Sequence, residues 1–301
     1  MTLSSKQQPD FRDVAVVGLG QMGRGIAANL DRAGRLKAAW DLSEACRQAA
    51  GLSDAVALAP PERFGAVSTV IFVVPGSAQI AEVLPAVLAL PGAGRRTAVD
   101  LTTSHPAATG ALAAKAVAAG WDYVDCGMTG GAAGADAGTL TLMAGGEVEA
   151  LARVMPALEV IAAKVVRVGA SGAGHTMKLV HNMICHTVFL ATAEGCRMAE
   201  RAGLDLDAAI EVINAGNARS FISEARFPRH ILTGKFDGRS VVANLEKDLR
   251  MANAFAGEIG QPAAYTALTA RLLAQAVAEG RAGDDFTTLY KVYDELVEKT
   301  A

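Results

Sequence analysis

The residue pattern with the most specific chemistry is a glycine-rich segment near the start of the chain. It reads Gly18-Leu19-Gly20-Gln21-Met22-Gly23. The apolar run Val14–Val17 precedes it, as in a buried parallel strand, and the residues after it favour a helix. Gly18 permits a tight turn, Gly20 lets the backbone approach a pyrophosphate, and Gly23 lets the helix pack against the strand. The helix N-terminus offers N–H groups to phosphates, so the segment predicts a dinucleotide site.

A second signal follows the next predicted strand, Leu36–Trp40, where Asp41 stands. An acidic side chain here accepts hydrogen bonds from the adenosine ribose hydroxyls and repels a 2′-phosphate. The next residues are Leu42 and Ser43, so no arginine follows directly. Asp41 therefore predicts NAD as the cofactor, with NADP less favoured. The alternative is a solvated aspartate that caps the helix starting near Ser43.

A third segment, Asp125–Gly131, follows a strand and contains Thr129, Gly130 and Gly131. Successive glycines leave backbone N–H groups accessible, and the threonine adds a hydroxyl. Such a loop can hold a carboxylate without a full balancing charge. The alternative is a flexible glycine-rich connection.

A lysine and an asparagine at helical spacing form the fourth candidate. Lys178 and Asn182 lie one turn apart on a predicted helix and face the same way. A lysine in a cleft can act as acid or base if desolvation and nearby positive charge lower its pKa from about 10.4 towards neutrality. Asn182 could donate to a substrate hydroxyl or hold the lysine. The alternative is a solvated lysine on the helix surface.

Lys247 and Asp248 form the last candidate pair. Neighbouring positions on a helix do not face each other, so we expect one side chain to reach a cleft while the other braces it. Alone, this pair indicates no particular chemistry.

Alternating strands and helices must position the first of these residues. Strands are predicted at Val14–Val17, Leu36–Trp40, Val70–Val74, Thr97–Leu101, Tyr123–Asp125, Thr139–Ala144 and Val165–Val168. Alanine-rich helical segments lie between them, which predicts a doubly wound parallel α/β sheet. Its ligand crevice lies beyond the carboxyl ends of the strands, where several of the candidate residues fall.

Only helices are predicted after Gly174. A long one covers His175–Arg201, and further helices are expected at Leu206–Asn214, Ser220–Leu232, Leu245–Glu258, Pro262–Glu279 and Thr287–Lys299. We therefore expect a dinucleotide-binding domain at 1–168 and an all-helical domain at 169–301, opened by a long interdomain helix.

Composition excludes several classes of protein. The chain has 301 residues, 51% of them hydrophobic, and a net charge of −3 without a basic run, which argues against a nucleic-acid partner. No apolar stretch is long enough to span a membrane. The polar residues 1–12 predict a frayed tail and not a secretion signal, so we expect a cytoplasmic protein.

Scattered cysteines predict reduced thiols, mostly in the core, because no C-x-x-C pair occurs. Cys185 stands one turn after His181, but the sequence offers no acidic partner at suitable spacing. We therefore predict no metal site.

Together the candidate segments resemble the β-hydroxyacid dehydrogenase family over nearly the whole chain. The matches are GLGQMGRGIAANL, which includes Met22 and Asn29, then Asp125–Leu140, Gly172–Asn182 and Lys247-Asp248-Leu249. Val74-Pro75 and Asp100–Thr103 also look like the family's cofactor contacts. The resemblance implies a Rossmann-type domain followed by an all-helical domain that commonly dimerises, and we expect a homodimer or homotetramer.

The resemblance also implies a role for each candidate residue. Lys178 would be the catalytic general acid and base, and Asn182 would support the reacting hydroxyl. Thr129, Gly130 and Gly131 would bind the substrate carboxylate. Lys247, with Asp248 beside it, would lie near the nicotinamide and could hold down the pKa of Lys178. Thr103 and the Val74-Pro75 turn would flank the nicotinamide ribose.

One departure from the family pattern bears on the substrate. The usual loop reads Asp-Ala-Pro-Val-Ser-Gly-Gly, whereas this chain has Gly127 for proline, Met128 for valine and Thr129 for serine. We expect Gly127 to loosen the loop and Met128 to reshape the pocket, while Thr129 keeps the hydroxyl.

The sequence thus predicts an oxidoreductase that transfers a hydride between NAD and a small 3-hydroxy acid, similar to 3-hydroxyisobutyrate, or its semialdehyde. The alternatives are an NADPH-dependent reductase of small aldehydes from the same family, and a catalytically silent interaction protein that only binds the cofactor. Lys178, Asn182 and the glycine loop argue against a silent protein, which would not need them.

Overall fold

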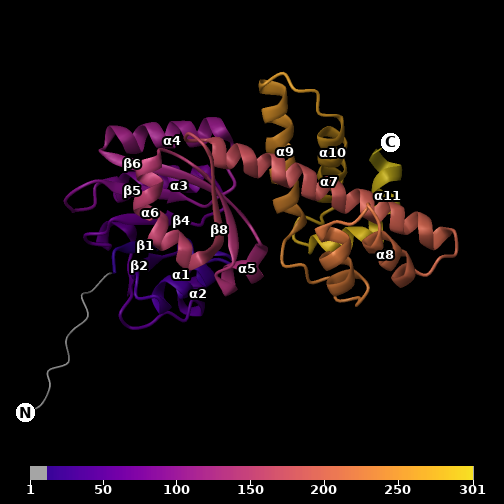
Figure 1. Cartoon of the computed structure of the whole chain (residues 1–301), viewed down its shortest axis with the longest axis horizontal. Coiled ribbons are helices and arrows are strands. Elements are labelled where there is room, and N and C mark those ends of the chain that lie inside the picture. The colour runs from indigo at the N-terminus through magenta and orange to yellow at the C-terminus, as the bar shows by residue number, and fades with distance from the viewer. Residues whose placement is uncertain (1–11, 301) are drawn as a thin grey trace, which may run out of the picture. The chain divides into compact units, whose positions relative to one another are not determined.

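The computed structural model describes residues 12–300, so the predicted polar tail lies, but for its last residue, outside the described residues. The described chain divides into two compact units, the first ending at Lys178 and the second starting at Leu179 (Figure 1). The division falls inside helix α7 (Ala173–Arg201), beyond the predicted boundary at 168–169. The first turns of α7 count with the first unit because they pack on its sheet.

An eight-stranded sheet forms the centre of the first unit, in the order β3-β2-β1-β4-β5-β6-β7-β8. The strands are β1 (Val14–Val17), β2 (Leu36–Trp40), β3 (Ala57–Leu58), β4 (Thr69–Phe72), β5 (Arg96–Asp100), β6 (Trp121–Thr129), β7 (Leu140–Gly145) and β8 (Ala162–Gly169). The predicted strands are confirmed, and the sequence reading missed β3, which has only two residues. Strands β1 and β4 are buried along their whole length because helices cover both faces of the sheet.

Two hydrophobic cores lie on the two faces of this sheet. On one face, Val14 and Val16 of β1 pack with α1 (Gly23–Arg32) and α6 (Val148–Ile161). On the other, Ala15 and Val17 pack with α3 (Ser77–Leu88) and α4 (Pro106–Ala118). Successive residues of a strand point to opposite faces, so one apolar strand supplies both cores. The remaining helices of this unit are α2 (Glu44–Ala49), η1 (Pro61–Arg63) and α5 (Gly131–Ala137).

The sheet is not parallel throughout. β6 pairs antiparallel with β7, with Asp125 opposite Gly145 and Thr129 opposite Thr141, and β8 then runs parallel to β7. A parallel pair needs a crossover of about a dozen residues or more. The connection from Thr129 to Leu140 holds only the short helix α5, so the chain turns back along β6. The predicted parallel sheet is therefore confirmed for β1 to β6 and wrong for the last two strands.

The second unit is helical, as predicted. It contains most of α7 and then α8 (Leu206–Ala215), η2 (Ile222–Ile231), α9 (Val242–Glu258), α10 (Ala264–Ala278), η3 (Phe286–Thr288) and α11 (Leu289–Thr300). Its core gathers Phe189, Phe227, Leu249 and Tyr290 with aliphatic residues from the other helices. Segment η2 is a π-helix and not the ordinary helix we predicted; Pro228 lies inside it and has no N–H to donate.

Within residues 12–300, no helix has the length and apolar content needed to cross a membrane.

Candidate active site

The glycine turn has the geometry that a bound phosphate group requires. Gly18 has φ +100°, and a Cβ there would strike the carbonyl of Val73. A Cβ on Gly23 would strike the carbonyl of Gly18, so α1 starts in contact with the turn. Over Gly20, in contrast, no atom lies within 4 Å of the place a Cβ would take, and the residue is exposed. The open space lies beside the N-terminus of α1, so this turn fits the pyrophosphate of a dinucleotide.

Asp41 braces this turn. Its Oδ2 accepts a hydrogen bond from the Leu19 N–H at 2.7 Å, and its Oδ1 accepts one from the Ser43 N–H at 2.8 Å. The alternative that Asp41 caps helix α2 (Glu44–Ala49) is wrong, because the cap is Ser43, whose hydroxyl accepts from the Cys46 N–H at 3.3 Å. Asp41 thus has a structural task at the end of β2 in addition to the predicted contact with the ribose.

Arg47 is a residue that the sequence reading missed. The guanidinium donates to the Asp41 carbonyl at 2.6 Å and stacks over the Trp40 ring, 4.3 Å from its centre. No arginine follows Asp41 directly in the sequence, but helix α2 brings Arg47 back into contact with Asp41. The signal was the position of Arg47 one turn into a helix that starts at Glu44.

Three further predicted cofactor residues lie at the same edge of the sheet. Val74 and Pro75 follow β4, and Thr103 follows β5. Because β1, β4 and β5 are parallel neighbours, with Val17 paired to Phe72 and Phe72 to Asp100, their carboxyl ends meet at one edge. Ligands of doubly wound sheets bind at this edge.

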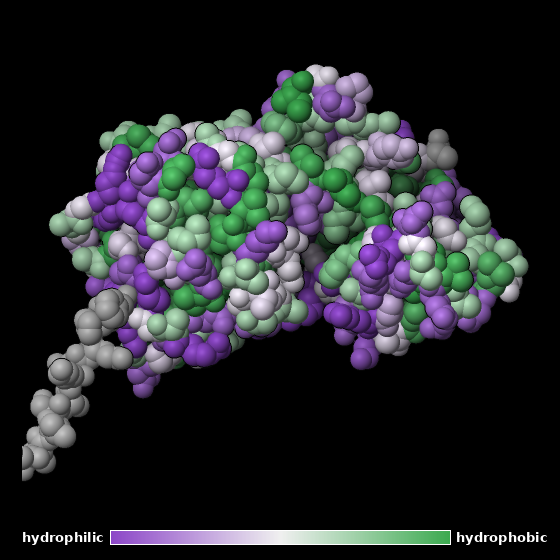
Figure 2. Space-filling view, in the orientation of Figure 1, coloured by the Kyte–Doolittle hydropathy of each residue, from purple (hydrophilic) through white to green (hydrophobic). Residues whose placement is uncertain are grey.

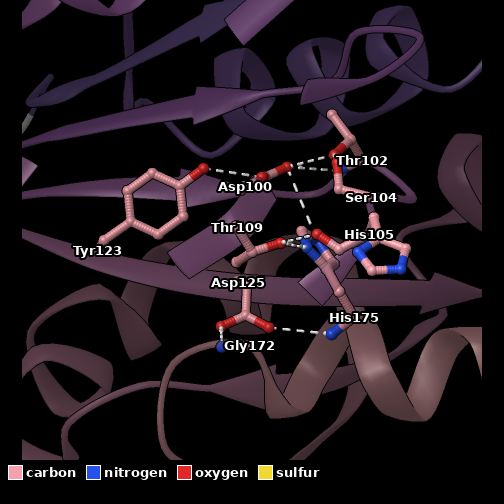
Figure 3. A network of polar contacts seen from close by, with 9 residues as sticks. All are labelled: Asp100, Thr102, Ser104, His105, Thr109, Tyr123, Asp125, Gly172 and His175. Carbon is pink, nitrogen blue, oxygen red and sulfur yellow. Dashed lines mark hydrogen bonds and ion pairs between the residues drawn. The ribbon is translucent and has the colours of Figure 1, made fainter. Parts of the chain in front are cut away.

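A buried polar network lies behind that edge (Figure 3). Asp100 accepts hydrogen bonds from the Thr102 N–H at 2.9 Å, the Thr102 hydroxyl at 2.6 Å and the Tyr123 hydroxyl at 2.8 Å. Nε2 of His175 lies 3.8 Å from the same carboxylate, and its Nδ1 is 2.7 Å from the Thr109 hydroxyl. Asp100, Thr109 and His175 are fully buried, so the network joins β5, α4 and α7 out of reach of water.

A second buried carboxylate, Asp125 on β6, holds the start of α7 (Figure 3). It accepts hydrogen bonds from the Gly172 N–H at 2.7 Å and the His175 N–H at 2.9 Å. The first N–H groups of a helix lack acceptors within the helix, so Asp125 acts as a cap supplied from a distant strand.

Burial and these carboxylates decide the protonation of two neighbouring groups. Burial and the adjacent Asp100 raise the pKa of Tyr123 far above its usual range. Burial, and then Asp125, raise the pKa of the Cys126 thiol well above its usual value. Both side chains therefore stay neutral at physiological pH, and neither is suited to act as a base or nucleophile.

Lys178 sits against the same strand. A Cβ built on Gly127 would lie 2.5 Å from the Lys178 Cβ, so the lysine stem passes directly over the Gly127 backbone. Asp125, Gly127 and Thr129 alternate along β6 and therefore share one face of the sheet. The substrate loop predicted at Thr129, Gly130 and Gly131 starts on the face over which Lys178 passes.

Met128 lies on the opposite face of β6. It is partly buried and packs against the core that contains Cys126, α1 and α6. Our expectation that Met128 reshapes the pocket is therefore wrong, because strand alternation turns it away from Lys178. The expectation that Gly127 loosens the loop is also wrong, because Gly127 lies within β6, opposite Met143.

In the second unit, the remaining site residues gather around Asp248. The Asn182 amide donates to its Oδ2 at 2.6 Å, and the Lys247 ammonium lies 3.6 Å from its Oδ1. Asn182 and Asp248 are both buried. The expectation that Lys247 and Asp248 do not face each other is wrong, because the long lysine stem folds back to its neighbour.

Comparisons with known proteins identify the family of this chain. A family model of the NAD binding domain of 6-phosphogluconate dehydrogenase matches residues 13–169. A second model, described as NAD-binding of NADP-dependent 3-hydroxyisobutyrate dehydrogenase, matches residues 172–293. The chain is 31% identical to 2-(hydroxymethyl)glutarate dehydrogenase of Eubacterium barkeri over 94% of its own length and 95% of the relative's. The chain belongs to the β-hydroxyacid dehydrogenase family.

Other members of this dehydrogenase family match over similar lengths. The protein is 31% identical to L-threonate dehydrogenase of Cupriavidus necator, with 94% of this chain and 96% of the relative covered. The solved structure of Mycobacterium tuberculosis 3-hydroxyisobutyrate dehydrogenase with L-serine has a TM-score of 0.83 at 27% identity, and the match covers 93% and 98% of the two chains. The protein is thus an NAD(P)-dependent hydroxyacid dehydrogenase.

Proposed function

We propose that this dehydrogenase oxidises a small 3-hydroxy acid, or reduces the matching semialdehyde, with Lys178 as general acid and base. The contact between Lys178 and Gly127 carries the proposal. This contact places the lysine side chain over one face of β6. Thr129 lies on the same face, at the end of the strand where the glycine loop begins.

Lys178 handles the proton in this scheme. In the oxidation, its neutral amine takes the proton of the substrate hydroxyl; in the reduction, its ammonium returns that proton to the same oxygen. A bound nicotinamide supplies the hydride chemistry at the carbon that carries this oxygen.

The loop after β6 would hold the substrate carboxylate. Gly130 has φ +121° and Gly131 has φ +63°, so this backbone takes a path that other residues rarely adopt. N–H groups turned outwards by such a path, together with the Thr129 hydroxyl, can bind a carboxylate. Asn182, oriented by Asp248, would donate to the reacting hydroxyl.

The substrate class follows from this geometry and from the relatives. The relatives are named for 2-(hydroxymethyl)glutarate, L-threonate and 3-hydroxyisobutyrate, and each of these compounds has a carboxylate with a hydroxyl on the β-carbon. A loop that binds the carboxylate and a lysine that handles the hydroxyl proton suit this pair of substrate groups. We propose NAD as the preferred cofactor because Asp41 keeps a carboxylate beside the glycine turn.

A homodimer or homotetramer is also proposed. Val180, Ile184 and Met198 on α7 and Tyr265 on α10 are exposed apolar side chains of the helical unit. Figure 2 shows hydrophobic residues among hydrophilic ones on the surface of this unit. A second copy of the chain could cover such residues.

The test is turnover with a panel of small 3-hydroxy acids and NAD, followed by nicotinamide absorbance, with 2-hydroxy acids as the contrasting class. Lys178→Ala is expected to abolish turnover and leave the Kd for NAD nearly unchanged. Lys115→Ala, which removes an exposed lysine of α4, is the matched control and should retain full activity. Preserved activity of Lys178→Ala would remove the assigned role. Tight cofactor binding without turnover of any substrate would favour a catalytically silent protein.

A further inference from the structure

Hydrogen bonds to a side chain of β6 hold the first turn of α7 against the sheet. Both hydrogen bonds that Asp125 accepts come from backbone N–H groups of this turn, those of Gly172 and His175 (Figure 3). The carboxylate has no exposed surface. Charge-assisted hydrogen bonds in such surroundings are about twice as strong as neutral ones.

The same turn cannot move closer to the sheet either. A Cβ on Gly174 would strike the carbonyl oxygens of Asp125 and Met143. A Cβ on Gly145 would lie 2.7 Å from the Asp125 Oδ1 and 2.7 Å from the Gly174 nitrogen. Backbone therefore lies directly on backbone here, and the position of α7 over β6 and β7 is fixed from both sides.

Gly127 is the place where this fixed position reaches Lys178. A Cβ there would lie 2.5 Å from the Lys178 Cβ, 3.2 Å from its Cγ and 3.0 Å from the Gly174 carbonyl oxygen. Gly127 is not among the glycines with positive φ, so its own backbone accepts an alanine. Because the helix is pinned, an added methyl group at residue 127 has to displace the lysine stem.

We propose that Asp125 and Gly127 are positioning residues for Lys178. Asp125 determines how close the first turn of α7 lies to β6. Gly127 leaves room for the lysine stem to pass over the strand, two residues before Thr129 on the same face. The distance between the proton-handling amine and the loop for the carboxylate is then set by a single strand, β6. This inference rests on the proposed acid–base role of Lys178.

Gly127→Ala tests the inference, with initial rates measured under saturating NAD. We expect kcat to fall about 10- to 100-fold, because a displacement of about 1 Å at a reacting group can cost that much. The KM for the substrate should change less, since the loop at Thr129 is untouched. The pH midpoint of kcat/KM should also move, which a purely structural role would not cause.

Gly110→Ala is the matched control. Gly110 is an exposed glycine of α4 in the same unit, and no atom lies within 4 Å of the place its Cβ would take. The added methyl group should leave kcat, KM and the pH midpoint at wild-type values. Binding of NAD and the melting temperature are recorded for both variants, so that loss of fold is separated from loss of position.

Each result decides the inference. A folded Gly127→Ala variant with wild-type kcat and pH midpoint would overturn it. If that variant does not fold, Asp125→Asn takes its place; a lower kcat with retained NAD binding supports the inference, and an unchanged kcat refutes it. Inactive Lys178→Ala beside a fully active Gly127→Ala means that the positioning fails while the proposed function stands. An active Lys178→Ala removes both.

Discussion

The backbone N–H of Leu19 donates to Oδ2 of Asp41 at 2.7 Å, although 22 positions separate the two residues. This hydrogen bond joins the glycine turn after β1 to the end of β2. It fixes a negative charge beside the turn, where the adenosine ribose of a bound dinucleotide is expected. The preference for NAD should therefore depend on the charge of Asp41 as well as on its shape.

Asp41→Asn tests this dependence, because the amide oxygen can still accept from the Leu19 N–H, whereas the charge and the second acceptor, for the Ser43 N–H, are lost. We expect the ratio of kcat/KM for NAD to that for NADP to fall by about tenfold, the equivalent of ~1.4 kcal/mol, which is close to the lower end of the range of about 1.5–3 kcal/mol for a hydrogen bond to a charged group. Steady-state kinetics with each cofactor measures the ratio. Asp207→Asn, a neutralised carboxylate in the first turn of α8, serves as the control. An unchanged ratio in Asp41→Asn would refute the role.

Arg47 should supply any gain in NADP binding, since it lies against the Asp41 carbonyl. In the Asp41→Asn background, we expect Arg47→Ala to reverse that gain. A double variant that uses NADP as well as the single one would show that the guanidinium takes no part.

The Asn182–Asp248 hydrogen bond gives a second prediction. Asp248→Ala leaves the buried Asn182 amide without this acceptor, and a hydrogen bond to a charged group contributes about 1.5–3 kcal/mol. If Asp248 orients Asn182 toward the substrate hydroxyl, kcat/KM should fall about 10- to 100-fold. Glu246→Gln, which neutralises a neighbouring carboxylate on α9, should have little effect. Wild-type kinetics for Asp248→Ala would place Asn182 outside the reaction.

Asn29 is expected to act on stability and not on chemistry. Its amide donates to the carbonyls of Gly25 at 2.9 Å, Ala135 at 2.8 Å and Asp136 at 3.2 Å, which ties α1 to α5. Asn29→Ala removes these hydrogen bonds between the two helices, and we expect a loss of about 1–3 kcal/mol in the free energy of unfolding. Urea denaturation measures this loss. A variant with wild-type stability would show that the three acceptors find other partners.

Cys126 predicts a dependence of stability on pH. Burial raises the pKa of its thiol in the folded protein, so the stabilising contribution is complete below the unfolded pKa of about 8.5. It is lost as the pH rises above that value, by up to about 1.4 kcal/mol per pH unit, because the unfolded thiol ionises first. Urea denaturation between about pH 8 and 10 should show this decline, and Cys126→Ala should make it shallower.

Labelling with a thiol reagent gives an independent measurement. Cys46 and Cys185 are half-buried and should react in the native protein, whereas Cys126 and Cys196 are buried and should react only after unfolding. Burial and the nearby Glu200 also raise the pKa of Cys196, to about 11. Labelling of native Cys126 as fast as Cys46 would contradict its burial.

Much of the first unit could be predicted because its signals are local. The apolar run Val14–Val17 and the glycines after it determine a strand, a turn and a helix within a few residues. Helix α7 follows in the same way from the residues after Gly174. Periodicity and turn chemistry act over short stretches, so they can be read without the fold.

What only the tertiary structure decided depends on contacts between distant segments. The reversal of β7 and the network of Asp100 with His175 and Thr109 have no local signal.

Gly127 is the clearest case. From the sequence we expected Gly127 to loosen a loop, whereas in the fold the Lys178 stem passes over its backbone within strand β6. The sequence by itself determined which residues could do the chemistry. Packing decided how these residues are positioned. The absence of a side chain at Gly127 matters only because the Lys178 stem packs in the space that a side chain would take.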